Sequence, residues 1–188
     1  MERVKAVNYL KLKASTGVLG NFTAQGKNYP AYPTISNTSA AVFGDNAVPG
    51  LEPDYLFDPN LHWETVNSTE VGLEGDFLDN RLHFEGVYYY KKTKDLIVLL
   101  EPSGIKPTLT NNGSIENKGF EFSASWTQTL MKDLTVVLGG NFTTFKNKVV
   151  SLPYPARQRI SSSEQTPNQA QTGYPIGYFY GLIHDGIY

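Results

Sequence analysis

Apolar and polar residues alternate with a two-residue period along several segments of this 188-residue chain, and no other feature limits the possible folds as much. Such alternation is typical of β-strands that present one apolar and one polar face. A first short segment, residues 9–15, reads YLKLKAS, and longer ones follow at 69–77, 82–91, 120–127 and 134–143. We therefore expect an all-β fold built on an antiparallel meander of long strands.

The second and third of these segments are separated by residues that favour a tight turn. The pair Asp79-Asn80 suits a two-residue hairpin loop. With that loop, Phe77 faces Leu82, and every apolar residue on one face of the hairpin lies opposite another apolar residue or a glycine. The pattern thus predicts both the turn and the register of the hairpin.

The same register places charged side chains opposite one another on the polar face. Asp76 faces His83, and Glu74 faces Glu85. Two glutamates directly opposite each other destabilise an ordinary sheet. We therefore expect the polar face to be well hydrated.

The last two segments predict a second hairpin. A three-residue loop that ends at Asp133, with this aspartate in the left-handed conformation, aligns the apolar faces of the two strands. Trp126 then faces Leu138, and Phe122 faces Phe142. The opposite face of this hairpin is small and polar.

Short turns and long connections alternate along the chain. The long connections are residues 16–61, 93–114 and 149–172, and the first of them contains five prolines and little periodicity, so we expect it to be irregular. Strands of about ten residues with short turns at one end and long loops at the other are typical of a transmembrane β-barrel, in which the turns are periplasmic and the loops extracellular. A soluble β-sandwich with its apolar face turned inward is the alternative. The five or six predicted strands are fewer than the ~8 of the smallest barrels, so either neighbouring sequence is missing or the sheet is not a membrane barrel.

In a barrel, the two faces have different surroundings. We expect one set of residues to face the lumen: Glu70, Glu74, Asp76, Glu85, Tyr89, Glu121 and Asn141. We expect the other set to face lipid: Val71, Leu73, Phe84, Tyr88, Phe122, Trp126, Leu138 and Phe142. Tyr88 and Tyr90 suit an aromatic girdle at the membrane interface. Further aromatic candidates for contact with a substrate or partner lie in the long connections: Tyr29, Tyr32, Tyr55 and Tyr154.

Composition excludes several classes of protein. The 16 Lys and Arg balance 18 Asp and Glu, so the chain lacks the basic excess of a nucleic-acid binder. Cysteine is absent, and His62, His83 and His184 show no ligand spacing, so we expect no metal and no thiol chemistry. The carboxylates alternate regularly along the strands, which indicates that they line a solvated surface. They are not expected to form the catalytic acid–base pair of a glycoside hydrolase. We expect no enzyme, no cofactor and no nucleic-acid partner.

Four blocks of the sequence resemble the C-terminal barrel of the SusC/RagA-type TonB-dependent outer-membrane transporters of the Bacteroidetes. Residues 9–21, YLKLKASTGVLGN, resemble the family's YLKLRASYGxxGN, and residues 61–96 resemble its pattern of LxWE, GLD, NRL and KKTxDLL. Residues 112–121, NGSIENKGFE, resemble NxGxxxNKGxE, and residues 173–188 resemble GxPIGxxYGxxxDGIY. The blocks follow the family's order and spacing over almost the whole chain.

The resemblance implies nutrient import across the bacterial outer membrane. It implies an oligosaccharide or a peptide as the substrate, captured with a SusD-like surface lipoprotein, and energy from the TonB complex acting on a plug domain. It also implies that residues 1–188 are part of a 22-stranded barrel, without the plug, the signal peptide or the terminal strand. We therefore expect a fragment, with Met1 an internal methionine or an artificial start. The alternative function is that of a soluble carbohydrate-binding β-sandwich module.

Overall fold

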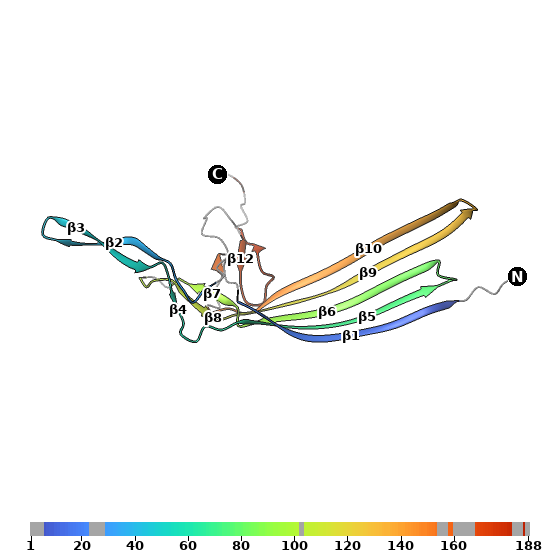
Figure 1. The fold of residues 1–188 in the computed structure, drawn as a ribbon, viewed down its shortest axis with the longest axis horizontal. Coiled ribbons are helices and arrows are strands. Elements are labelled where there is room, and N and C mark those ends of the chain that lie inside the picture. The colour runs from blue at the N-terminus through green and yellow to red at the C-terminus, as the bar shows by residue number, and fades with distance from the viewer. Residues whose placement is uncertain are drawn as a thin grey trace. The chain divides into compact units, whose positions relative to one another are not determined.

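Five long strands form the largest sheet of the protein, which we describe from a computed structural model (Figure 1). They are β1 (Val7–Asn21), β5 (Glu64–Phe77), β6 (Leu82–Lys94), β9 (Ser114–Met131) and β10 (Leu134–Ser151). The sheet order β1-β5-β6-β9-β10 follows the order of these strands in the chain. The predicted all-β meander of long strands is therefore confirmed.

The structure describes residues 6–22, 29–101, 104–153, 158–159, 168–181 and 186. No helix in these ranges is long and apolar enough to span a membrane. The described residues divide between two compact units, which we treat separately. The first comprises 1–18, 67–92 and 116–148, and the second comprises 19–66, 93–115 and 149–188.

The turn between β5 and β6 has its predicted centre. Asp79 and Asn80 have φ angles of 59° and 61°, and the Arg81 amide donates a hydrogen bond to the Leu78 carbonyl over 3.3 Å. Leu78 also lies in the left-handed region, with φ 56°, which is uncommon for a residue of its size. Across the strands, the His83 ring nitrogen Nδ1 lies 2.7 Å from Asp76 Oδ1, in agreement with the predicted pairing.

The turn between β9 and β10 differs from the prediction in one respect. Only Lys132 and Asp133 lie between the two strands, and Asp133 is not among the described non-glycine residues with positive φ. The left-handed conformation expected for Asp133 is therefore wrong, because β9 continues to Met131 and shortens the loop. Further along, the Thr129 and Thr135 hydroxyls lie 3.1 Å apart, which agrees with the predicted pairing of the strands.

The long connections contain short strands, so the expected irregular stretch at 16–61 is wrong. β1 extends to Asn21, and β2 (Ile35–Phe43) and β3 (Asn46–Pro53) form an antiparallel hairpin that turns at Gly44, with φ 61°. The sequence pattern did not predict this hairpin, because its prolines interrupt the alternation of apolar and polar residues. Proline is nevertheless tolerated in edge strands, and both strands of a two-stranded hairpin are edge strands.

The second unit has a small buried core. β4 (Leu56–Phe57), β8 (Thr108–Asn111) and β7 (Ile97–Leu100) form a three-stranded sheet, around which Tyr55, Ile97 and Leu109 are buried. A third short sheet contains β11 (Gln158–Arg159), β12 (Asn168–Ala170) and β13 (Tyr178–Phe179). These sheets order parts of all three long connections.

Candidate functional site

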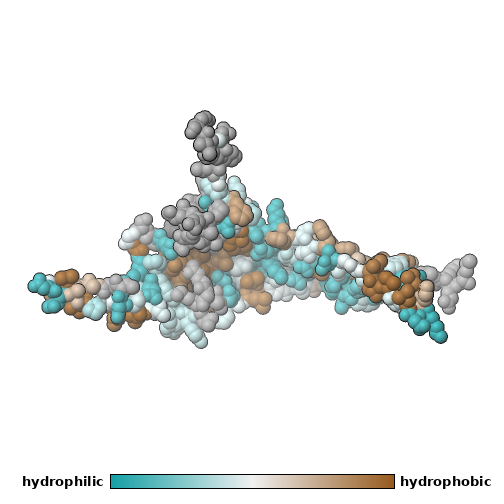
Figure 2. All heavy atoms as spheres, turned by 90° about the horizontal axis from the view of Figure 1, so that it is seen from above, coloured by the Kyte–Doolittle hydropathy of each residue, from teal (hydrophilic) through white to brown (hydrophobic). Residues whose placement is uncertain are grey.

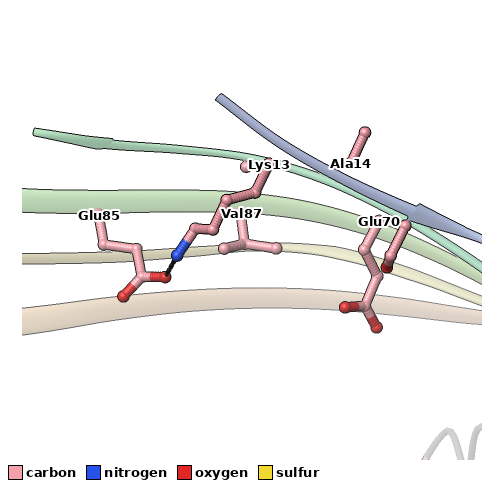
Figure 3. Close-up of a pocket in the computed structure, with 7 residues that line it drawn as sticks. Lys13, Ala14, Glu70, Glu85 and Val87 are labelled. Carbon is pink, nitrogen blue, oxygen red and sulfur yellow. Dashed lines mark hydrogen bonds and ion pairs between the residues drawn. The ribbon is translucent and has the colours of Figure 1, made fainter. Parts of the chain in front are cut away.

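A charge cluster occupies the polar face of the large sheet (Figure 3). The Lys13 ammonium group on β1 lies 2.9 Å from Glu74 Oε2 on β5 and also donates a hydrogen bond to Glu85 on β6. Lys13, Ala14, Glu70 and Glu85 line one depression, and the side chains of Lys13 and Ala14 point to opposite sides of β1 (Figure 3). The alternation predicted from the sequence is thus visible in the side chains.

Lys13 explains how the two facing glutamates are tolerated. Hydration alone was expected to relieve their repulsion, but the structure places a cation from the neighbouring strand between them. The lysine reaches them over Gly72, where an added Cβ would lie 3.8 Å from Lys13 Cε and 3.1 Å from Val87 Cγ2. The lysine was not among the predicted site residues, although it occupies a polar position in the alternation of β1.

Tyr89 also lies on the polar face. Its ring occupies the space above Gly119, where an added Cβ would overlap the tyrosine ring and the Thr144 carbonyl. The Lys91 ammonium lies 5.4 Å from the centre of the Tyr89 ring and 3.5 Å from Glu70 Oε1. The ring of Tyr89 thus fills the space left by the missing side chain of Gly119, and Lys91 makes a cation–π contact with it.

A second depression continues the polar face toward β10. Its volume is about 250 Å³, and its polar lining residues are Glu85, Glu121, Ser123, Asn141 and Thr143. Together with the Lys13 cluster, the Glu70–Lys91 pair, the Asp76–His83 pair and Tyr89, it accounts for all seven predicted polar-face residues. The structure thus brings these residues to one face, with carboxylates in excess over the lysines that contact them.

The apolar face carries a row of aromatic rings. Phe84 stacks on Phe77 and on Phe122, with ring centres 5.5 and 6.4 Å apart, and Phe122 lies 6.5 Å from Phe120. Most of the predicted apolar-face residues are exposed, with Phe84 and Trp126 partly covered. Figure 2 shows hydrophobic side chains gathered near the end of the long strands that carries the two turns. Since Leu138 and Phe142 are more than 60% exposed, at 66% and 62%, the described residues do not cover this face as a β-sandwich would.

Glu64, at the start of β5, is a buried carboxylate that sequence reasoning did not single out. Its relative exposure is 9%, and it accepts hydrogen bonds from the Asn21 amide over 3.0 Å and from the Ile97 backbone N–H over 2.8 Å. It therefore joins the end of β1 to β7. In the sequence, Glu64 is distinguished only as the last residue of the LHWE block that resembles the family pattern.

We predict that Glu64→Ala destabilises this junction by about 2–3 kcal/mol, because it leaves the buried Ile97 N–H without its charged acceptor. The measurement is amide hydrogen exchange at Ile97 in the full-length protein. Glu64→Gln retains an acceptor oxygen for this N–H and should lose less than half as much protection. Unchanged exchange at Ile97 in the alanine variant would contradict the assignment.

The aromatic candidates in the long connections have different surroundings. Tyr29 and Tyr32 are 72% and 78% exposed and remain available for contact. Tyr55 is buried with Ile97 and Leu109, so its expected role in substrate contact is wrong. Burial raises the pKa of Tyr55, and the adjacent Asp54 charge raises it further. Tyr154 lies outside the described residues.

Asp58 orders the chain between β4 and β5. Its Oδ1 accepts the Asn60 backbone N–H over 2.8 Å, and its Oδ2 accepts the Thr110 hydroxyl over 3.2 Å. These hydrogen bonds, that from the Asn60 backbone above all, hold the pKa of Asp58 below its usual value. The carboxylate thus supports a loop and shows no sign of a raised pKa suited to acid catalysis.

The two histidines that the structure describes each contact a carboxylate and lie in different parts of the chain. His83 contacts Asp76, His62 Nε2 lies 3.8 Å from Asp95 Oδ2, and His184 lies outside the described residues. Within the part of the chain that the structure describes, no three His, Asp or Glu side chains form a group that could hold a metal ion.

Comparison with known proteins finds similarity along nearly the whole chain. Residues 5–186 match the family model described as TonB dependent receptor-like, beta-barrel. TonB-dependent receptor P3 of Formosa agariphila is 36% identical over 188 residues, covering 95% of this chain and 18% of that protein. TonB-dependent receptor SusC of Bacteroides thetaiotaomicron is 30% identical over 203 residues, covering 100% of this chain and 20% of that protein.

Solved structures show the same similarity. The structure of the RagAB peptide transporter superposes with a TM-score of 0.75 at 25% identity, covering 95% of this chain and 19% of the matched chain. The RagAB peptide importer in the "open-open" state superposes with a TM-score of 0.72 at 26% identity, covering 93% and 19% of the two chains. The chain thus spans about a fifth of the length of these relatives.

Proposed function

This chain belongs to the TonB-dependent receptor β-barrel family, and on that premise we propose that it forms part of the barrel wall of an outer-membrane nutrient importer. The observation that carries the proposal is the contrast between the two faces of the large sheet. One face exposes a row of aromatic and aliphatic side chains, and the other holds a solvent-accessible charge cluster. Long strands with these two faces suit a wall between lipid and an aqueous lumen.

In this proposal, the polar face lines the lumen and has no catalytic role. Lys13 offsets one of the two negative charges of the facing Glu74 and Glu85, and Lys91 offsets that of Glu70. The remaining carboxylates and Tyr89 give the lumen wall hydrogen-bonding and stacking groups. Such a surface favours the passage of a polar solute and does not require a reaction.

The substrate that we propose is an oligosaccharide or a peptide. The structurally similar RagAB is a peptide transporter, which supports the peptide. Tyr89 adds an aromatic side chain to the polar face, where it suits contact with either a sugar ring or a peptide side chain. We further propose that TonB supplies the energy through a plug domain and that a SusD-like lipoprotein captures the substrate at the extracellular loops.

The β2–β3 hairpin is the element that we propose for contact with this lipoprotein. It carries exposed apolar side chains, among them Val42, Phe43 and Leu51, at 72%, 68% and 73%. Exposed apolar groups on a loop are typical of a protein–protein contact. Lys106 anchors the base of the hairpin, with its ammonium 2.7 Å from Glu52 Oε2 and 2.6 Å from the Pro53 carbonyl.

The orientation of the barrel can be tested with epitope tags in the full-length transporter. A tag at Asp45, in the β2–β3 turn, should be labelled by antibody on intact cells. A tag at Asn80, in the β5–β6 turn, should be labelled only after the outer membrane is permeabilised, because short turns face the periplasm.

Both tagged proteins must appear at wild-type amounts in the outer membrane for this comparison. Labelling of intact cells at Asn80 and not at Asp45 would reverse the orientation. Recognition by the long loops would then be ruled out, since they would lie on the periplasmic side.

A further inference from the structure

The apolar face becomes basic at one level on three neighbouring strands. On β6, the outward positions run from Tyr88 through Tyr90 to Lys92. On β9 they run from Phe120 through Lys118 to Glu116, and on β10 from Thr144 through Lys146 to Lys148. The three strands are adjacent in the sheet (Figure 1), so these residues form one patch, which we call the lysine patch: Lys92, Lys118, Lys146 and Lys148, with Glu116.

One carboxylate, that of Glu116, forms an ion pair within the lysine patch. The Lys92 ammonium lies 3.3 Å from Glu116 Oε1, and the Tyr90 hydroxyl hydrogen-bonds the same carboxylate. Within the described residues, Lys118 and Lys146 have no carboxylate at ion-pairing distance, and both are exposed. With four lysines and one glutamate, the patch carries an excess of three positive charges.

Lys118 and Lys146 lie at the rim of an apolar depression. Tyr88, Phe120 and Thr144 line it together with the two lysines, and its volume is about 350 Å³. Phe122 stacks near Phe120 and continues the apolar surface away from the lysines. A ligand that satisfies both parts of this surface has to carry negative charge directly next to hydrocarbon.

We propose that Lys118 and Lys146 bind the phosphate of a phosphorylated glycolipid in the outer leaflet, whose acyl chains lie against Phe120 and Phe122. The proposal rests on the proposed function, because it needs this face to meet lipid and this end of the strands to be extracellular. Any lysine near a membrane surface attracts anionic lipid headgroups, even where the protein has no defined lipid site. Here the two free lysines flank one depression on adjacent strands, which favours a defined site over diffuse attraction.

The test uses the full-length transporter purified in detergent and native mass spectrometry with added lipid A as the probe. The wild-type protein should bind phosphorylated lipid A and bind its dephosphorylated form at least tenfold more weakly. Lys118→Gln and Lys146→Gln should each weaken binding about fivefold, and the double variant about thirtyfold, from the usual contribution of a lysine to anionic-lipid binding. Lys132→Gln, which removes the same charge from the turn of the same hairpin, should bind like the wild type.

Two results would overturn the site. One is equal affinity of the folded double variant and the wild type for phosphorylated lipid A. The other is equal wild-type affinity for phosphorylated and dephosphorylated lipid A, since phosphate would then not be recognised. Migration of the unheated protein as a folded barrel in SDS gels verifies that each variant folds.

A different measurement, the epitope labelling, tests the proposed function. Labelling at Asn80 in place of Asp45 would overturn the orientation, and with it the outer leaflet, whichever way the lipid experiment turns out. Lipid binding that depends on Lys118 and Lys146, together with labelling at Asp45, supports both proposals.

Discussion

Phe122→Lys should destabilise the full-length barrel by about 2–4 kcal/mol, the usual cost of a lysine on the lipid-facing side near the middle of the bilayer. Phe122 lies near the centre of β9 and stacks on Phe84, so the substitution also removes an aromatic contact on the exposed apolar face. The measurement is the midpoint of urea unfolding in lipid vesicles, with intrinsic fluorescence as the signal.

The matched control is the next residue of the same strand. Ser123→Lys places the same side chain in the polar depression that Glu85 and Glu121 line, where we expect a change of no more than about 0.5 kcal/mol. Equal destabilisation by the two substitutions would show that Phe122 and Ser123 do not have different surroundings. A larger effect of Ser123→Lys would exchange the lumen and lipid faces.

The second large effect concerns the 188-residue chain by itself. We expect it to aggregate in water and to require detergent, because its exposed apolar face exceeds the few hundred Å² that a soluble monomer tolerates. Leu12, Leu138 and Phe142 alone are 74%, 66% and 62% exposed. Among the described strands, β1 and β10 also form the two edges of the five-stranded sheet, and exposed edges promote association.

Size-exclusion chromatography with light scattering, with and without detergent, measures this directly. The expected result is large aggregates in buffer and smaller particles in detergent. A monodisperse monomer that melts cooperatively in buffer would show that the apolar face is covered in solution, and would restore the soluble sandwich as the better interpretation.

The alternation of residues was sufficient to predict the central hairpins. The Asp79-Asn80 turn and the Asp76–His83 contact agree with the prediction, because in a strand the side-chain period leaves only one register that keeps all apolar residues on one face. The second hairpin agrees in its pairing near Thr129 and Thr135 but not in the conformation of Asp133. Turn geometry depends on one or two φ angles, and a three-residue and a two-residue loop differ little in sequence.

The long connections were less predictable. Tyr55 resembled an exposed loop aromatic, yet it lies in a buried core with Ile97 and Leu109, which are about 40 to 55 residues further along the chain. The β2–β3 hairpin was missed because Pro49 and Pro53 interrupt its alternation. The structure of these connections depends on contacts between segments that are distant in the chain, and a local residue pattern cannot predict such contacts.

By itself, the sequence determined which residues share a face, since alternation is a local property of an extended backbone. The tertiary structure alone decided which charges meet between strands that no short turn joins. Lys13 is separated from Glu85 by 72 residues, and Glu64 from Ile97 by 33, so only strand order brings them together. A side chain's partners depend on the neighbouring strand, and the register between β1 and β5, which a long connection joins, is not restricted by a short turn.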